Sequence, residues 1–150
     1  MSTDDVPASL SQVDLFQSLS TKVLGKVADA GKVADFPSGA EVVAEGESVS
    51  GFKAFSSTGV ELHVILSGNA LVKVHGATVA SLSEGAYFGE LSLIDGGPRS
   101  AGVVAGDAGL RTFAINKWTF DELLSKHPEM AVPMLRVLCG RLRRAEATTD

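Results

Sequence analysis

The alternation of hydrophobic and polar positions divides the chain into three stretches. Residues 8–31 and 117–145 have the spacing of amphipathic helices, whereas residues 32–116 contain short runs rich in Val, Leu and Ile. Turns are expected between these runs, at residues 37–39, 45–47, 67–69, 75–76 and 106–107, and residues 48–59 are expected to form a longer loop or hairpin. Short strands with regular turns favour a sandwich or barrel over a parallel α/β sheet. The expected strands are Val33–Phe36, Glu41–Ala44, Leu62–Leu66, Ala70–Val74, Thr78–Leu82, Ala101–Val104 and Leu110–Ile115.

Candidate caps and breaks define the helices more closely. Ser20 is expected to cap a helix that ends at Gly31, because a hydroxyl satisfies free N–H groups and glycine stops a helix. Thr119 and Glu122 have the spacing of a capping box. Pro128 divides the C-terminal stretch, so the pattern predicts two helices there and a mainly β fold with helices on both sides.

Composition narrows the class of protein. With 150 residues, 45% of them hydrophobic and 21% charged, and a net charge of −5, the chain is expected to be one globular domain, residues 1–150. The mild acidity argues against a nucleic-acid-coating surface, and no apolar run approaches the roughly 18–20 residues of a membrane-spanning helix. A single cysteine, Cys139, permits no internal disulfide and, with the polar N-terminus, favours a cytoplasmic setting. We therefore expect neither nucleic-acid binding nor membrane insertion.

Residues 87–103 combine the groups that a sugar phosphate needs. A short helix starting at Gly89 would present free backbone N–H groups, and Arg99 would add a planar cation suited to phosphate oxygens. Glu90 can accept a hydrogen bond from a sugar hydroxyl, and Ser100 supplies a further hydroxyl donor. An internal Glu90–Arg99 ion pair that pins a loop accounts for the same residues, and the residues alone leave both interpretations open.

The same segment resembles the phosphate-binding cassette of the cyclic nucleotide-binding domain family. Phe88–Leu93 (FGELSL), five further residues and Arg99–Ala101 (RSA) fill the cassette pattern without a break. An FGE triplet alone is a weak signal, whereas an ordered set of matches is specific. The other matches, which extend the resemblance over most of the chain, are Phe36–Ala40, Glu45–Glu47, Leu66–Gly68 and His127–Glu129.

This resemblance implies a jelly-roll β-barrel (a double-stranded β-helix) with N-terminal helices and two C-terminal helices. It also implies a non-catalytic protein that binds a cyclic nucleotide in the cassette, residues 88–101, without a metal or catalytic cofactor. Glu90 would accept from the ribose 2′-hydroxyl, and Arg99 would pair with the exocyclic phosphate oxygens. The ligand-binding residues that the resemblance implies are Gly89, Glu90, Leu91, Arg99, Ser100 and Ala101.

The resemblance says less about the base. Ser100 after the arginine favours cyclic AMP, with cyclic GMP as the alternative. Family transcription factors contact adenine through a Thr-Ser pair on the last helix, but the corresponding residues here are Ala145 and Glu146. Leu138 and Leu142 are therefore candidates for capping the base by apolar contact.

The output is expected to lie in another chain. Two amphipathic helical segments follow the complete cassette, so we expect the C-terminal helices to move on ligand binding. Few residues follow the last arginine, so we expect these helices to act on a protein partner or in a homodimer. The alternative is an interaction module on the same fold with an unoccupied pocket. His63 and His75 lie at strand-like positions and lack a His-x-His pair, so no metal site is expected. Four arginines are expected to form a solvated helix face: Arg136, Arg141, Arg143 and Arg144.

Overall fold

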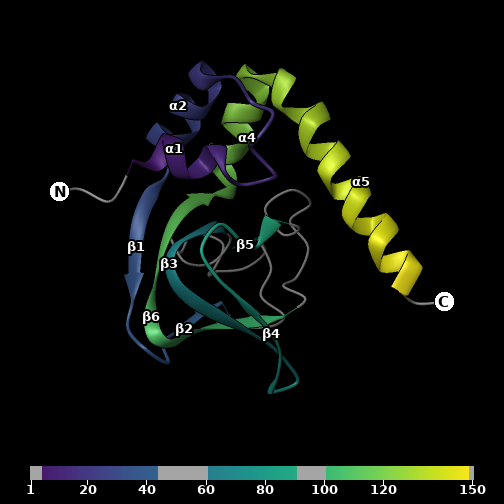
Figure 1. The fold of residues 1–150 in the computed structure, drawn as a ribbon. Helices are drawn as coiled ribbons and strands as arrows, with labels where there is room; N and C mark the ends of the chain where they lie inside the picture. The colour runs from purple at the N-terminus through teal and green to yellow at the C-terminus, as the bar shows by residue number, and fades with distance from the viewer. Residues whose placement is uncertain (1–4, 44–60, 91–100, 149–150) are drawn as a thin grey trace.

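The computed structural model describes residues 5–43, 61–90 and 101–148 (Figure 1). It is mainly β with helices before and after the strands, which confirms the predicted fold class. The predicted second turn at Glu45–Glu47, the long loop of residues 48–59 and part of the cassette lie outside the described residues. The elements follow in the order α1 (Val6–Ser11), α2 (Thr21–Ala30), β1 (Lys32–Phe36), β2 (Glu41–Val43), β3 (Glu61–Val74), β4 (Ala77–Leu82), β5 (Tyr87–Phe88), β6 (Gly102–Asn116), α4 (Lys117–Lys126), the 3-10 helix η2 (Pro128–Met130) and α5 (Ala131–Thr148).

Helix α2 begins and ends where the sequence predicts. The Ser20 hydroxyl accepts a hydrogen bond from the Val23 N–H at 3.2 Å, which confirms the cap. Gly31 follows the last helical residue with an extended backbone, so its role is not the left-handed turn that often ends a helix. A Cβ at this position would collide with the Phe113 ring and the Ala114 carbonyl. Gly31 is therefore needed for the close approach of α2 to β6.

The described strands form an antiparallel sheet in the order β1-β6-β3-β4, with β2 paired to β6 and β5 paired to β3. Strands β3 and β6 form its centre and curve strongly, so that the sheet wraps around itself (Figure 1). This arrangement is the curved antiparallel sheet of a jelly roll, as predicted.

Each of the two long strands was expected to be two short ones, and that expectation is wrong. Glu61–Val74 is a single strand with register shifts on either side of Gly68, and Gly102–Asn116 continues through the predicted turn at residues 106–107. Gly68 and Gly109 both have positive φ, of 81° and 77°, and a Cβ on Gly68 would overlap the Gly109 carbonyl. The glycines therefore let the two strands bend together instead of ending them.

Two other predicted turns are present. His75 and Gly76 have φ of 51° and 80°, the two positive values of a tight hairpin turn between β3 and β4. After β1, the Ala40 N–H donates to the Pro37 carbonyl at 3.0 Å, and Gly39 has a φ of 80°. Both turns return the chain into the sheet at the positions that the sequence indicates.

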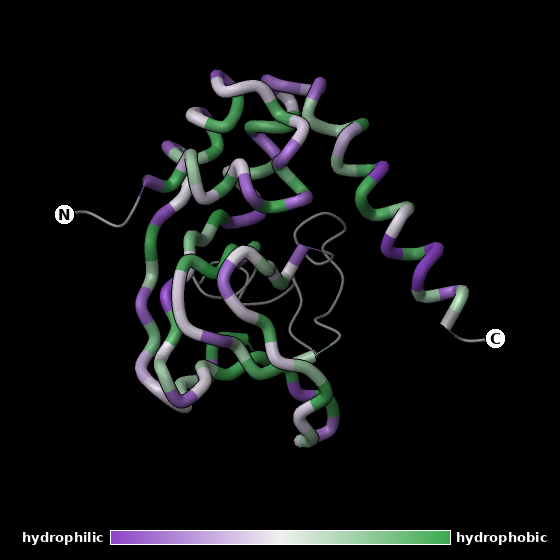
Figure 2. The backbone as a smooth tube through the Cα atoms, in the orientation of Figure 1, coloured by the Kyte–Doolittle hydropathy of each residue, from purple (hydrophilic) through white to green (hydrophobic). Residues whose placement is uncertain are grey.

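Buried apolar residues form two clusters on opposite sides of β3. The larger joins the helices to the sheet and includes Phe16, Phe113 and Phe120. The smaller lies between β2, β3, β5 and β6 and includes Ile65 and Phe88. Figure 2 shows hydrophobic segments in both the sheet and the helical layer above it. The second cluster directly supports the start of the cassette at Phe88.

The two C-terminal helices differ in placement. Asn116 caps α4, because its side-chain oxygen accepts from the Thr119 N–H at 2.9 Å; the predicted Thr119–Glu122 capping box is therefore wrong. Strand β6 runs directly into this cap, which places Thr119 inside the first helical turn. The predicted break at His127–Pro128 is confirmed, and α5 then extends along the side of the barrel away from the helical layer (Figure 1).

Candidate functional site

The first part of the cassette is attached to β3 through a very short strand. Tyr87 and Phe88 form β5 and pair with Val64 and His63 of β3. Gly89 follows with a φ of 90°, a left-handed conformation that favours glycine, and the chain then turns into Glu90. Glycine is therefore needed here for backbone conformation, whatever ligand the cassette binds.

The other end of the cassette is attached to the opposite end of β3. Ala101 is half-buried and lies immediately before β6, whose first residue Gly102 pairs with Lys73. Of the predicted ligand-binding residues, the structure thus describes Gly89, Glu90 and Ala101. The remaining three lie outside the described residues, and their roles stay predictions: Leu91, Arg99 and Ser100.

Glu90 contacts the last helix through Arg141. Arg141 Nη1 lies 3.8 Å from Glu90 Oε2, and the Glu90 side chain is only 14% exposed. The Arg141 guanidinium also lies over the Tyr87 ring, 4.3 Å from its centroid, in a cation–π contact. One residue of α5 therefore contacts both β5 and the carboxylate proposed to bind the ribose.

This role of Arg141 was not expected from the sequence. Arg136, Arg143 and Arg144 are exposed, as predicted for a solvated helix face, whereas Arg141 is turned toward the barrel. The signal was present in its spacing: Arg141 follows the buried Met134 by seven residues, which places both on one helix face.

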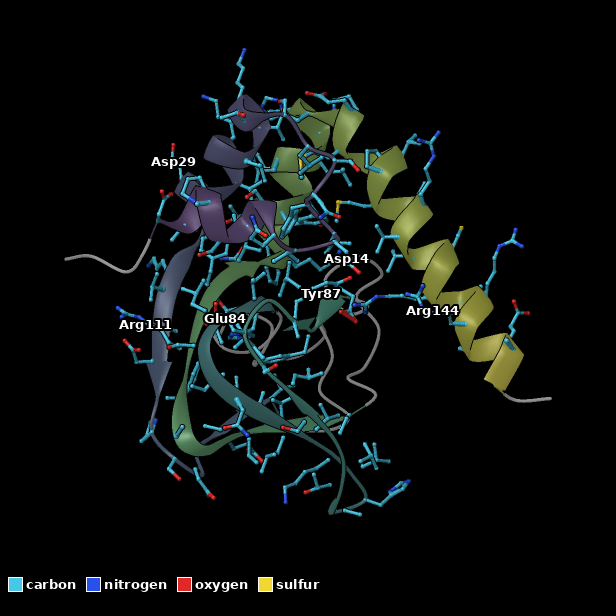
Figure 3. The ribbon with its side chains drawn as sticks, viewed as in Figure 1. Asp14, Asp29, Glu84, Tyr87, Arg111 and Arg144 are labelled. Carbon is cyan, nitrogen blue, oxygen red and sulfur yellow. The ribbon has the colours of Figure 1, made fainter. Side chains whose placement is uncertain are left out.

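Tyr87 is the other polar group at this junction. Its side chain is buried, and this burial raises the pKa of its hydroxyl above the ordinary value; the nearby carboxylates of Asp14 and Glu90 act in the same direction, and Arg141 opposes them. Figure 3 shows Tyr87 and Asp14 on the side of the barrel that α5 faces. The junction thus combines a neutral phenol, two carboxylates and a cation.

The two predicted base-capping leucines lie on α5. Leu138 is half-buried, and Leu142 is 62% exposed. Their contact with a base stays a prediction. Within the described part of the chain, no group of three or more His, Cys, Asp or Glu side chains is placed to hold a metal ion. None of the described helices is long and apolar enough to cross a membrane.

Comparison with known proteins supplies independent information. A family model described as "Cyclic nucleotide-binding domain" matches residues 33–127. A cAMP-dependent protein kinase regulatory subunit of Mycosarcoma maydis is 34% identical over 123 residues, which make up 77% of this chain and 22% of that protein. The chain therefore corresponds to only a small part of that relative.

Solved structures agree with the fold. The crystal structure of the Thermus thermophilus catabolite activator protein matches with a TM-score of 0.75 and 27% identity, covering 91% of this chain and 62% of that one. The regulatory domain of Toxoplasma gondii PKA, solved with cAMP, matches with a TM-score of 0.72 and 25% identity, covering 95% of this chain and 50% of that one. Both likenesses include the barrel and most of the flanking helices.

Proposed function

The chain belongs to the cyclic nucleotide-binding domain family, and we propose that it is a non-catalytic sensor that binds cyclic AMP and signals through its C-terminal helices. One observation carries this proposal: Glu90, the acceptor expected for the ribose, lies 3.8 Å from Arg141 on α5. A ligand that engages Glu90 therefore acts on a group already in contact with the helix that would transmit the signal.

The ligand chemistry follows from the cassette. We expect Glu90 to accept from the ribose 2′-hydroxyl, and Arg99 to pair with the exocyclic phosphate oxygens, assisted by Ser100 and by backbone N–H groups near Gly89. A cyclic phosphodiester has a single negative charge, so one arginine suffices without a metal. Ser100 favours cyclic AMP over cyclic GMP, and the solved PKA regulatory domain that contains cAMP supports this preference.

Signal transmission requires that the ligand prefer one position of α5 over another. A ribose hydroxyl that donates to Glu90 competes for the carboxylate oxygens that contact Arg141. Coupling free energies between two such sites are typically about 1–3 kcal/mol, and the coupling is reciprocal. We therefore expect ligand binding to shift α5, and a partner that holds α5 to change nucleotide affinity.

The partner surface is expected on α5. Its apolar residues Val132, Leu135 and Leu142 are 52%, 57% and 62% exposed, so the helix has apolar area available for a protein partner or a second copy of the chain. One relative of this chain is a regulatory subunit of a protein kinase, and this likeness supports a protein partner. The single cysteine keeps the cytoplasmic setting as our expectation.

Calorimetric titration with cyclic AMP and cyclic GMP tests this proposal. The unaltered chain should bind cyclic AMP more tightly, and Arg99→Ala should weaken binding about 10- to 100-fold, because a hydrogen-bonded charged group contributes about 1.5–3 kcal/mol. Arg143→Ala, which removes an exposed arginine of α5, is the matched control and should leave binding unchanged. No heat with either nucleotide up to millimolar concentration would contradict the proposal.

A second candidate is an interaction module whose pocket stays unoccupied, with Glu90 paired to Arg141 in place of a ligand. Ala145 and Glu146, at the positions where family transcription factors contact adenine, favour this candidate. In that case the ion pair serves only to fix α5. Thermal unfolding distinguishes the two, because a ligand that binds only the folded chain raises its melting temperature. Absence of any shift with cyclic nucleotides, combined with retained partner capture through α5, would favour the module.

A further inference from the structure

A histidine lies inside the barrel beneath the cassette. His63 of β3 is 1% exposed, and it pairs with Phe88 of β5 on one side and with Ala114 of β6 on the other. Burying a polar ring among apolar side chains is unfavourable unless its nitrogens are satisfied. A fully buried strand position usually holds an aliphatic or aromatic residue, so a histidine here requires a specific reason.

The contacts of His63 come from several strands. Nδ1 lies 2.9 Å from Oγ1 of Thr112 on β6, which is fully buried, and Nε2 lies 3.8 Å from Oε1 of Glu61 on β3. The ring stacks on Phe88, with centroids 4.9 Å apart and planes 12° apart. The Phe36 ring of β1 packs edgewise against it, with centroids 5.9 Å apart.

These contacts determine the orientation of the imidazole plane. An apolar ring of similar size would fill the volume, but packing alone would then fix its angle. The hydrogen bond with Thr112 limits rotation of the imidazole, because it holds one edge of the ring against β6. Since the Phe88 ring lies nearly parallel to the imidazole, its orientation is limited in turn.

The orientation of Phe88 matters because the backbone pairing of β5 is short. The strand has two residues, and its ladder with β3 covers only the positions of His63 and Val64. Gly89 follows in a left-handed conformation and turns the chain toward Glu90. The direction of this turn depends on the orientation of the Phe88 backbone and side chain. A small tilt at Phe88 would therefore displace the Glu90 carboxylate.

We propose that His63 is a positioning residue, which with Thr112 orients Phe88 and thereby places Glu90 for the ribose 2′-hydroxyl. The inference rests on the proposed binding of a cyclic nucleotide. His63 does not touch the ligand in this account. Its effect is confined to the part of the affinity that depends on the 2′-hydroxyl.

The test compares cyclic AMP with 2′-deoxy cyclic AMP, which lacks the hydroxyl that Glu90 is expected to bind. Three variants separate the contacts. His63→Phe retains an aromatic stack without the hydrogen bond, His63→Gln retains a polar group without the stack, and Thr112→Val removes only the hydroxyl. Val27→Ala, which shortens a buried side chain of α2 in the other cluster, controls for a general loss of stability.

The unaltered chain should prefer cyclic AMP over the deoxy analogue by about tenfold or more, a typical ratio for one hydrogen bond to a charged group. The His63 variants and Thr112→Val should lose most of that ratio by weakening cyclic AMP alone, whereas Val27→Ala should keep it. In the double variant His63→Phe/Thr112→Val, the ratio should fall no further than in His63→Phe, because both changes remove the same hydrogen bond.

The outcomes separate the two proposals. If the unaltered chain binds neither nucleotide, the proposed function fails, and the role of His63 fails with it. If it binds and discriminates, but the variants keep the full ratio or weaken both nucleotides equally, only the role of His63 is overturned. Thr112→Val, the smallest change, keeps the test decisive if the His63 variants do not fold.

Discussion

The two C-terminal helices are adjacent in the chain but are held by different kinds of contact. Helix α4 buries Phe120 and Leu123 in the large cluster that also contains side chains of α2 and β6. Helix α5 is held in that cluster near its beginning, by Met134, whereas its second half contacts the cassette region through Arg141. Three of its apolar side chains are more than half exposed: Val132, Leu135 and Leu142.

This difference indicates which helix can respond to a ligand. Moving α4 would expose buried aromatic and aliphatic area, which costs about 25 cal/mol for each Å². Moving the second half of α5 would break the ion pair and the cation–π contact that Arg141 makes with the described residues, and contacts of these two kinds are individually weak. A binding energy of a few kcal/mol is therefore enough to reposition α5 while α4 stays in place.

The largest expected effect concerns the fixed helix. Phe120→Ala should lower the free energy of unfolding by about 3–5 kcal/mol, because it removes a buried aromatic side chain and leaves a cavity. Chemical denaturation measures this change. A loss below about 1 kcal/mol, the usual level for an average substitution, would mean that α4 is not fixed as described.

A second expectation concerns the position of α5 and uses the sole tyrosine of the chain. Because burial raises the pKa of Tyr87, folding favours its neutral form; this contribution is complete below the unfolded value of about 10 and is lost as pH rises toward the folded value. The free energy of unfolding should therefore fall in alkaline solution. The phenolate absorbance of the folded chain should appear at higher pH than that of the unfolded chain.

The same titration reports whether Arg141 lies against Tyr87. Its positive charge lowers the pKa of Tyr87, so Arg141→Ala should move the titration to still higher pH. Arg143→Ala, the exposed control, should not move it. An identical titration in both variants would place the second half of α5 away from the barrel in solution.

The smallest expected effect on the free energy of unfolding concerns α5. Leu142→Ala should change the free energy of unfolding of the ligand-free chain by no more than about 0.5 kcal/mol, because the side chain is 62% exposed. If Leu142 caps the base, the same variant should weaken cyclic AMP by roughly three- to tenfold, corresponding to about 0.7–1.4 kcal/mol of apolar contact. Val79→Ala, an equally exposed position on β4, should change neither.

Helix caps, tight turns and glycine positions that depend on neighbouring residues were mostly predictable from the sequence. Ser20, the His75–Gly76 turn and the glycine of the cassette follow rules that involve a few neighbouring residues. The merging of the predicted short strands was not predictable, because it depends on Gly68 meeting Gly109 across the sheet. The roles of His63 and Arg141 depend on which faces of β3 and α5 meet the cassette, and one strand or helix does not reveal what it will pack against.

The central claim is that cyclic AMP moves α5 relative to α4, and the chain contains its own probes for that movement. Its single tryptophan, Trp118, is 52% exposed on α4, and its single cysteine, Cys139, is exposed on α5. Energy transfer from Trp118 to an acceptor attached to Cys139 reports the separation of the two helices. Saturating cyclic AMP should change the transfer efficiency in the otherwise unaltered chain, and Arg99→Ala should show no change at the same concentration. Binding that calorimetry detects but that leaves the transfer efficiency unchanged would contradict the account.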